Sequence, residues 1–366
     1  MSQPEALTPW LKQALIQLIA DRTGFKIRDN DQAAFAGIIT KRTQRLGLIF
    51  PENYYQLLEE KTNQSNQEWK QLIPEITNTE SFFFRDKGQF KLLENSILPD
   101  LIHYKSANKT LRICSAGCST GEEPYSLAIL LKRLIPHITE WDLTILGVDI
   151  NSVAINKAKT GLYRPWSFRG LDEVIKQTFF EEINGYYYID KSVKDMVKFQ
   201  TVNLLEDAFP ENDSELREMD LILCRNVFIY FDKSAIKTIL DKFYNALNPL
   251  GYLLVGHAEL YSQKLLPFQV RVFEESIAYQ RPADDLADAI PKSDQTPLIP
   301  HSTQTATSEI MSSSSEQLFE ENDIKMKKVA LNLLRQLPAD TRIARQGNLT
   351  ASELILKIEK SLKETN

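Results

Sequence analysis

Hydrophobic positions recur at helical spacing through the first eighty residues of the chain. Thr8 is a predicted N-cap, and Gly24 is placed to end the first helix. Ser65 with Glu68 has the spacing of a capping box. The four predicted helices begin at Pro9, near Asp31, at Pro51 and at Ser65. We therefore expect residues 1–80 to form an all-α N-terminal domain.

The pattern changes after this region to short apolar runs that alternate with helical stretches. The predicted strands are 111–114, 143–148, 221–223 and 252–255, and the predicted helices are 125–134, 152–159 and 234–247. Buried strands separated by helices predict an α/β fold with a parallel sheet covered on both faces, here over residues 81–281. Residues 186–189 and 197–201 instead suggest an inserted antiparallel hairpin, giving a β-subdomain at about 183–201.

Charge divides the end of the chain from its body. The 366 residues carry a net charge of −6, which argues against nucleic acid as a partner. Residues 282–323 hold nine acids, one base and eleven Ser or Thr residues, so we expect an acidic disordered linker. Residues 324–366 are basic and contain apolar positions at helical spacing. They are predicted to form a short helical C-terminal segment with an unknown partner.

Several features favour a cytoplasmic protein. No run of eighteen uncharged apolar residues exists, so we expect no membrane insertion. The first ten residues lack the basic and apolar regions of a secretory signal. Cys114, Cys118 and Cys224 cannot all pair, which fits a reducing compartment, and no Cys/His spacing indicates a metal site.

Small residues follow the first predicted strand, where backbone can approach a ligand closely. Gly117 and Gly121 match neither a dinucleotide fingerprint nor a phosphate-binding loop, and Glu122 and Glu123 follow them. Carboxylates here favour a cationic ligand, such as an ammonium or a sulfonium, over a pyrophosphate. A tight turn whose acids favour the helix dipole explains the same residues equally well.

Two further strand ends carry candidate ligand-binding groups. Asp149 ends the second strand, where a carboxylate accepts both ribose hydroxyls in dinucleotide folds; its alternative role is a helix N-cap. The third strand leads into Arg225 and Asn226, which we expect to be exposed, and then to Tyr230. Asn226 and Tyr230 would project into the crevice, while the neighbouring aromatic residues belong to the core.

Together these motifs resemble the chemotaxis receptor glutamate methyltransferases, the CheR family. The matching stretches are TESFFFRD at 79–86, STGEEPYS at 119–126, DI at 149–150, YR at 163–164, NLL at 203–205, CRNVFIYFD at 224–232 and GHAE at 256–259. They occur in family order. The family pattern usually has Asn where this chain has Thr79, and Ser where it has Ala258.

The resemblance implies a Rossmann-like domain that binds S-adenosyl-L-methionine and methylates receptor glutamates, giving methyl esters. By motif, the implied cofactor-binding residues are Thr79, Ser81, Arg85, Glu122 or Glu123, Asp149, Asn203, Leu204, Asn226 and Val227. Arg85 and Tyr230 are the implied catalytic residues, with Arg85 orienting the incoming carboxylate. A non-catalytic S-adenosylmethionine-binding signalling module is the alternative function.

The resemblance also implies a partner, the cytoplasmic helical domain of a methyl-accepting chemotaxis-type receptor. Lys41, Arg42 and Arg45 share much of one face of the second predicted helix. We expect this basic face to bind the glutamate-bearing substrate helix. A solvated basic surface is the alternative interpretation.

Overall fold

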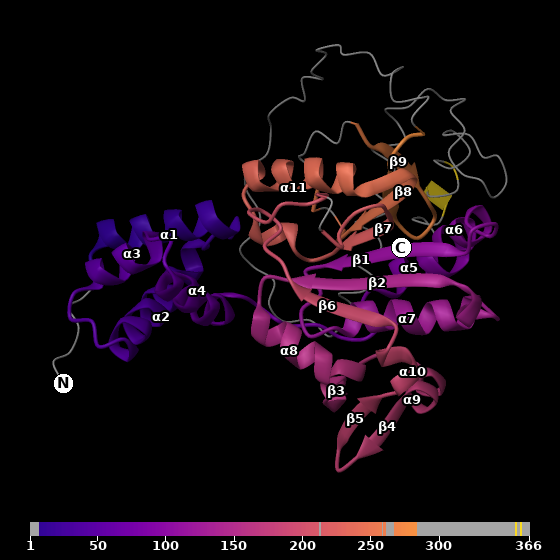
Figure 1. Cartoon of the computed structure of the whole chain (residues 1–366), viewed down its shortest axis with the longest axis horizontal. Helices are drawn as coiled ribbons and strands as arrows, with labels where there is room; N and C mark the ends of the chain where they lie inside the picture. Colours follow the sequence, from indigo (N-terminus) through magenta and orange to yellow (C-terminus); the bar gives the residue numbers. More distant parts are fainter. Residues whose placement is uncertain are drawn as a thin grey trace.

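The computed structural model describes residues 7–211, 214–257, 259–260 and 267–283, together with 356, 359 and 360. Within these ranges the chain forms a helical N-terminal lobe, a layered α/β body and a small second sheet (Figure 1). Apart from the few residues just named, the predicted linker at 282–323 and the predicted helices of 324–366 lie outside the described residues.

Four helices build the N-terminal lobe: α1 (Pro9–Thr23), α2 (Gln32–Arg45), α3 (Pro51–Glu59) and α4 (Asn63–Ile76). The predicted ends of the first helix are confirmed, since the Thr8 hydroxyl accepts from the Leu11 N–H at 3.2 Å and Gly24 has a φ of 76°. The predicted capping box is wrong. Thr62 caps α4 by accepting from the Ser65 N–H at 3.1 Å, which leaves the Glu68 side chain free for another contact.

A buried ion pair joins α2 to α4 inside this lobe. Arg42 donates to both carboxylate oxygens of Glu68 at 2.8 and 2.7 Å, and the Tyr54 hydroxyl of α3 donates to the same carboxylate at 2.8 Å. The predicted basic face of Lys41, Arg42 and Arg45 is therefore wrong for Arg42, which is only 6% exposed. The buried carboxylate of Glu68 needs a charged partner, and Arg42 provides it.

The body is built on a seven-stranded sheet in the order β6-β2-β1-β7-β8-β10-β9. Its strands are β1 (Thr110–Ala116), β2 (Asp142–Asp149), β6 (Val197–Thr201), β7 (Met219–Cys224), β8 (Leu247–Val255), β9 (Gln269–Val272) and β10 (Ile277–Gln280). Neighbours from β6 to β8 pair in parallel, and β10 pairs antiparallel with β8 and β9. The predicted parallel sheet is thus confirmed, with an antiparallel extension at one end.

Helices cover both faces of this sheet, because alternate side chains of each buried strand point to opposite sides. Ile113 and Ile145 pack with α5 (Lys87–Leu92), α6 (Leu98–Tyr104) and α7 (Glu122–Leu134), while Cys114 and Leu146 pack with α11 (Lys233–Ala246). A π-helical turn, Leu93–Ile97, joins α5 to α6. Another helix, α8 (Ser152–Thr160), packs against β2 and β6. Figure 1 shows α11 and α7 on opposite sides of the strands.

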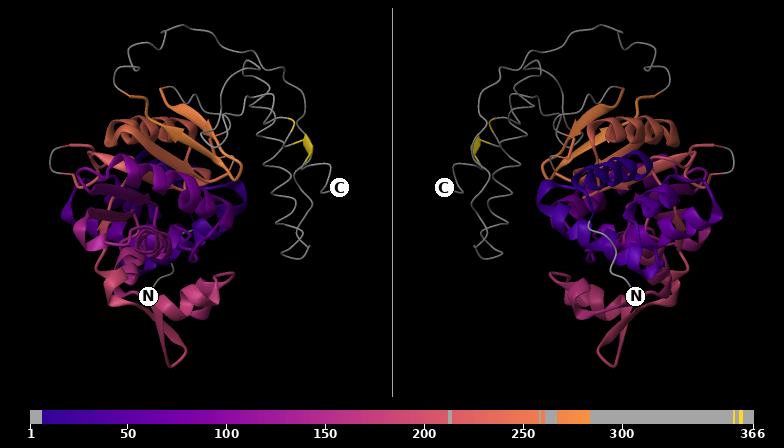
Figure 2. Two further views of the ribbon diagram at one scale, coloured as in Figure 1. Left: turned by 90° about the vertical axis from the view of Figure 1, so that its right-hand side faces the viewer. Right: turned by 90° about the vertical axis from the view of Figure 1, so that its left-hand side faces the viewer.

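A small three-stranded sheet projects from the body, as both views in Figure 2 show. It contains β3 (Leu162–Tyr163), β4 (Phe180–Ile183) and β5 (Tyr186–Ile189), with α9 (Glu173–Phe179) and α10 (Lys191–Lys194) beside it. The predicted pairing of 186–189 with 197–201 is wrong, since β5 pairs with β4 and β6 joins the main sheet. The turn between β4 and β5 is Asn184-Gly185, whose positive φ angles of 53° and 76° suit a tight hairpin.

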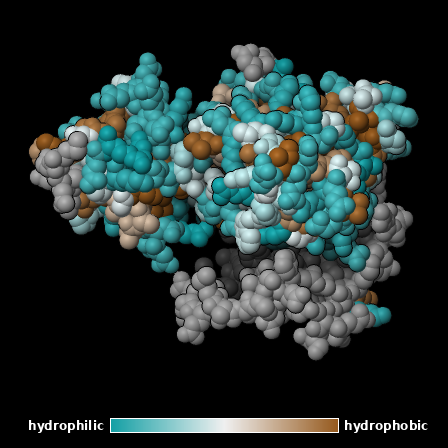
Figure 3. Space-filling view, turned by 90° about the horizontal axis from the view of Figure 1, so that it is seen from below, coloured by the Kyte–Doolittle hydropathy of each residue, from teal (hydrophilic) through white to brown (hydrophobic). Residues whose placement is uncertain are grey.

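The surface of the described residues is mostly hydrophilic on the face drawn in Figure 3, with hydrophobic side chains in small groups. Within the same residues, no helix combines the length and apolar character needed to cross a membrane.

We predict that Arg42→Ala lowers the free energy of unfolding by about 3 to 5 kcal/mol, because it leaves Glu68 buried without a charged partner. Urea titration followed by circular dichroism measures this loss. Arg45→Ala is the matched control. Its exposed pair with Glu75 is worth less than about 1 kcal/mol. Equal stability of the two variants would contradict the assigned role of the buried pair.

Candidate functional site

The carboxyl ends of the central strands open onto a cavity of about 470 Å³. Of the predicted site residues, those that line it are Ser81, Arg85, Glu123, Asp149, Asn203, Leu204, Asn226, Val227 and Tyr230. Thr79 and Glu122 are absent from this lining. Because parallel strands all end at the same edge, residues far apart in the chain meet here.

The loop after β1 brings its backbone to the cavity wall. Gly117 has a φ of 74°, and a Cβ built on it would lie 2.3 Å from Val227 Cγ2. Only glycine therefore fits between this loop and the one that follows β7. Ser119 has a φ of 52°, and its hydroxyl donates to the Thr79 carbonyl at 2.7 Å. Thr79 thus supports the loop through its backbone.

Asp149 holds two loops together at the end of β2. Its carboxylate accepts from the Ser119 N–H and from the Asn151 N–H, each at 2.8 Å. The helix that follows is capped instead by Asn151, so the alternative role of Asp149 as an N-cap is wrong. Burial raises the pKa of Asp149, and the two N–H groups oppose that shift. The side chain is left as a fixed acceptor at the cavity wall.

The two neighbouring glutamates after Gly121 have different environments. Glu122 is 1% exposed, and its carboxylate accepts from the Thr120 and Ser167 hydroxyls at 2.7 and 3.0 Å. Glu123 lines the cavity and accepts from the Ser115 hydroxyl at 2.6 Å. A cationic ligand in the cavity would therefore meet Glu123, while Glu122 joins α7 to the segment containing Ser167.

Arg225 is buried, contrary to the prediction that it is exposed, and its guanidinium is surrounded by partners. It donates to Glu123 at 2.9 Å, to the Gln89 side-chain oxygen at 2.6 Å and to the Arg85 carbonyl. Gln89 in turn donates to the Val255 carbonyl at 2.7 Å. Gln89 has no sequence signal for this role, because nothing in its local pattern shows that α5 faces the end of β7.

Beside Arg225, a second polar contact orders the loop that carries Arg85. Asp86 has a φ of 70°, caps α5 and accepts from His257. Burial alone would raise the pKa of Asp86, but the bond from His257 and the charge of Arg225 hold it below its ordinary value. Asp86 is thus engaged by His257 and Arg225, and no ion pair joins it to Arg85 among the described residues.

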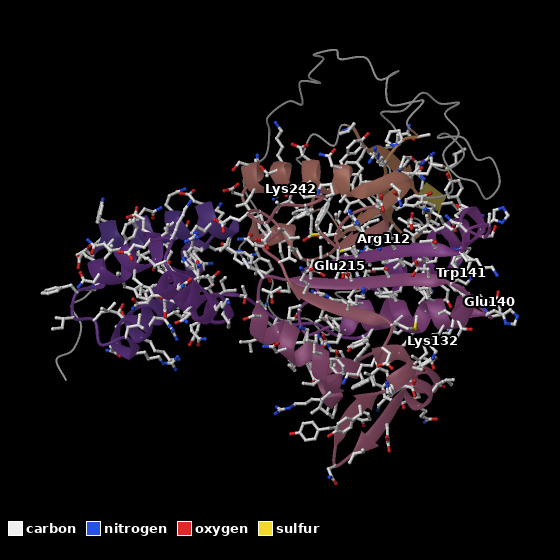
Figure 4. All side chains as sticks on the ribbon, in the orientation of Figure 1. Arg112, Lys132, Glu140, Trp141, Glu215 and Lys242 are labelled. Carbon is white, nitrogen blue, oxygen red and sulfur yellow. The ribbon has the colours of Figure 1, made fainter. Side chains whose placement is uncertain are left out.

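Lys242 of α11, labelled in Figure 4, supports the segment that follows β6. Its ammonium donates to the Leu204, Leu205 and Asp207 carbonyls at 3.2, 2.6 and 2.9 Å. Burial lowers the pKa of Lys242, against the opposing charge of Asp207. Three carbonyls bound to one cation fix the backbone that presents Asn203 and Leu204. The helical pattern gave no sign of this role.

The N-terminal lobe forms the other wall of the cavity, through residues that no sequence motif marks as part of the site. The lobe residues in the lining are Thr23, Phe25, Lys26, Ile27, Arg28, Asp31, Ile76, Thr77 and Asn78. The Asn203 side chain donates to the Arg22 carbonyl at 2.7 Å, which joins the end of α1 to the body. These contacts come from domain packing, which leaves no local sequence signal.

The cavity combines the groups that a nucleoside carrying a cationic amino acid requires. Asp149 offers a carboxylate acceptor at a strand end, Glu123 offers negative charge, and Leu204 with Val202 offers apolar surface. No phosphate-binding loop accompanies them. The fold and the site together define a nucleoside-binding α/β protein of the S-adenosylmethionine-dependent methyltransferase class.

Comparison with known proteins identifies the family. Residues 79–275 match the family described as CheR methyltransferase, SAM binding domain. A chemotaxis protein methyltransferase of Salmonella typhimurium is 31% identical over 74% of this chain and 91% of its own length. Relatives with the same description in Borreliella burgdorferi and Campylobacter jejuni are 31% and 38% identical, over 67% and 54% of this chain and 86% and 70% of their own lengths. The chain belongs to the CheR methyltransferase family and is an S-adenosylmethionine-dependent methyltransferase.

We predict that Asp149→Asn weakens S-adenosylhomocysteine binding about tenfold to a hundredfold, because an amide has one acceptor oxygen where the carboxylate has two. Isothermal titration calorimetry measures the change. Asp172→Asn is the matched control, since Asp172 also accepts from a backbone N–H but caps α9 outside the cavity lining. Unchanged affinity in Asp149→Asn would contradict the assignment of Asp149 to the binding site.

Proposed function

We propose that the chain transfers the methyl group of S-adenosylmethionine to glutamate side chains on the cytoplasmic helical domain of a chemotaxis-type receptor. The products are glutamyl methyl esters and S-adenosylhomocysteine. The observation that carries this proposal is the presence, in one cavity, of Asp149, Glu123 and the guanidinium of Arg85. These groups match a nucleoside, an ammonium and an incoming carboxylate, respectively.

The chemistry requires little proton transfer from the protein. A glutamate carboxylate is already ionised at neutral pH, so it needs no general base. Bound S-adenosylmethionine supplies a methyl group on a positively charged sulfur. The opposite charges of the two reactants diminish as they react, which a dry site favours. The chain therefore contributes mainly by positioning both partners and excluding water.

The cofactor-binding roles are assigned from the family motifs, and the residues that carry them line the cavity. Asp149 binds the ribose hydroxyls, Asn203 and Leu204 flank the adenine, and Glu123 holds the ammonium. Ser81 contacts the methionine end. Asn226 and Val227 complete the wall, and the Glu259 carboxylate supports them by accepting from the Asn226 N–H at 3.1 Å.

Arg85 is the residue that we assign to orienting the acceptor carboxylate. Its guanidinium donates to the Glu80 carbonyl at 3.2 Å and lies 5.7 Å from the centre of the Phe82 ring. No carboxylate pairs with it among the residues that the structure describes. A planar guanidinium can bind a carboxylate through two parallel hydrogen bonds. Tyr230 lines the same cavity and is assigned to the path of the methyl group.

We predict that Arg85→Ala lowers kcat about tenfold to a hundredfold at saturating S-adenosylmethionine, because the acceptor loses its orienting donor. The assay uses labelled S-adenosylmethionine with a purified receptor cytoplasmic fragment and counts base-labile methyl ester. Arg85→Lys should recover only part of the activity, since an ammonium lacks the planar fork.

The matched control is Arg133→Ala, which removes an arginine of α7 that pairs with Glu94. Its kcat should equal that of the wild type. Wild-type protein that binds cofactor but forms no ester would contradict the proposed function and favour the non-catalytic signalling module. Normal kcat in Arg85→Ala would contradict only the role of Arg85.

The exposed cations of α2 are proposed to contact the receptor. Lys41 and Arg45 lie 3.5 and 3.1 Å from the two oxygens of Glu75, so two cations share one carboxylate. This surface keeps a net positive charge without Arg42. Receptor methylation helices present glutamates, and complementary charge accelerates encounter and favours one orientation.

We predict that Lys41→Glu combined with Arg45→Glu raises the KM for the receptor fragment and flattens its dependence on salt, because attraction is replaced by repulsion. Steady-state methylation between low and high salt measures both effects. Affinity for S-adenosylhomocysteine should stay the same, since neither residue lines the cavity. An unchanged KM and salt dependence would show that Lys41 and Arg45 do not contribute to receptor binding.

A further inference from the structure

The loop between α1 and α2 reaches across to the segment that carries Tyr230. The Lys26 N–H donates to the Tyr230 carbonyl at 2.7 Å, and Phe25 forms an isolated antiparallel bridge with Phe231. The rings of Phe25 and Phe231 lie 5.3 Å apart. A Cβ on Gly24 would lie 2.3 Å from the Phe231 ring, so the loop is packed closely against this segment. These contacts therefore hold the loop in a fixed position beside Tyr230.

This loop places Arg28 at the cavity, on the side of Tyr230. The Arg28 guanidinium lies 5.7 Å from the centre of the Tyr230 ring, and Arg28 belongs to the cavity lining. No carboxylate forms an ion pair with it in the part of the chain that the structure describes. A guanidinium placed near a ring face keeps its N–H groups available to a carboxylate.

An incoming glutamate adds a negative charge to a cavity that already holds several carboxylates. Asp31, Glu80, Glu123 and Asp149 line it, Glu80 is paired with Arg169, and Lys26 adds a positive charge to the lining. Arg225 is already bound to Glu123. Repulsion between like charges grows as water leaves the site, because the effective dielectric constant falls. Arg85 and Arg28 are the lining guanidinia that have no carboxylate partner in the described ranges.

We propose that Arg28 is a substrate-binding residue that holds the acceptor glutamate carboxylate from the Tyr230 side, while Arg85 holds it from the side of Phe82. This inference rests on the proposed function. It assigns to the N-terminal lobe a direct part in selecting a carboxylate acceptor. The lobe then completes the acceptor site as well as the cofactor cavity.

A binding experiment tests this role without depending on turnover. The probes are two versions of a purified receptor cytoplasmic fragment, one with the acceptor glutamate and one with glutamine in its place. Calorimetry measures their affinity for wild-type, Arg28→Ala, Arg28→Lys and Arg133→Ala proteins, each saturated with S-adenosylhomocysteine. We expect wild-type and Arg133→Ala proteins to prefer glutamate about tenfold or more, since the paired charges are partly desolvated.

Arg28→Ala should lose most of that preference, and Arg28→Lys should keep part of it. Both variants should bind S-adenosylhomocysteine normally and unfold at the wild-type temperature. The preference should persist at high salt, because direct contact is screened less than long-range steering. In the methylation assay, Arg28→Ala should raise the KM for the glutamate fragment by a similar factor.

Three outcomes would overturn the role of Arg28. These are an equal glutamate preference in Arg28→Ala and the wild type, no preference in the wild type, and a preference that disappears at high salt. A parallel loss of S-adenosylhomocysteine affinity would instead show that Arg28 supports Tyr230 structurally. Failure of the wild type to form methyl ester would contradict the proposed function, while the binding preference would still test Arg28.

Discussion

The organisation of the site depends on one buried guanidinium, that of Arg225. A cation removed from water must be matched by nearby acceptors, or the fold loses several kcal/mol. The acceptors here come from three separate elements: Glu123 from the start of α7, Gln89 from α5, and the carbonyl of Arg85 from the preceding loop. Satisfying this one charge therefore brings the groups assigned to cofactor and acceptor into a single arrangement.

The backbone around this charge is constrained as well. Phe84, Asp86, Ser119 and Asn226 all have positive φ angles, which side chains other than glycine rarely adopt. Each lies in a loop beside the cavity, and hydrogen bonds to neighbouring elements hold several of them. The Phe84 N–H donates to the Ser126 hydroxyl at 3.0 Å, for example. Such conformations persist where the surrounding structure determines them, and they are concentrated at functional sites.

The two lobes contribute different halves of the chemistry. The sheet edge supplies the groups suited to a nucleoside, as parallel α/β folds commonly do. The N-terminal lobe closes the cavity and brings Arg28 to the ring of Tyr230. A methyl-transfer site benefits from this closure, because exclusion of water strengthens the electrostatic interactions that hold the acceptor. The lobe is thereby a wall of the cavity and, in the proposed function, the side from which a receptor helix would approach.

The sequence by itself determined the helical lobe, the parallel strands and the cavity residues that lie in motifs at the strand ends, because periodicity and strand-end motifs are local signals. Only the tertiary structure decided that Arg42 is buried against Glu68, that Glu123 rather than Glu122 lines the cavity, and that β6 joins the main sheet. The partners of a charge or a strand lie far along the chain. Their identity depends on how the elements pack, and neither spacing nor composition records that packing.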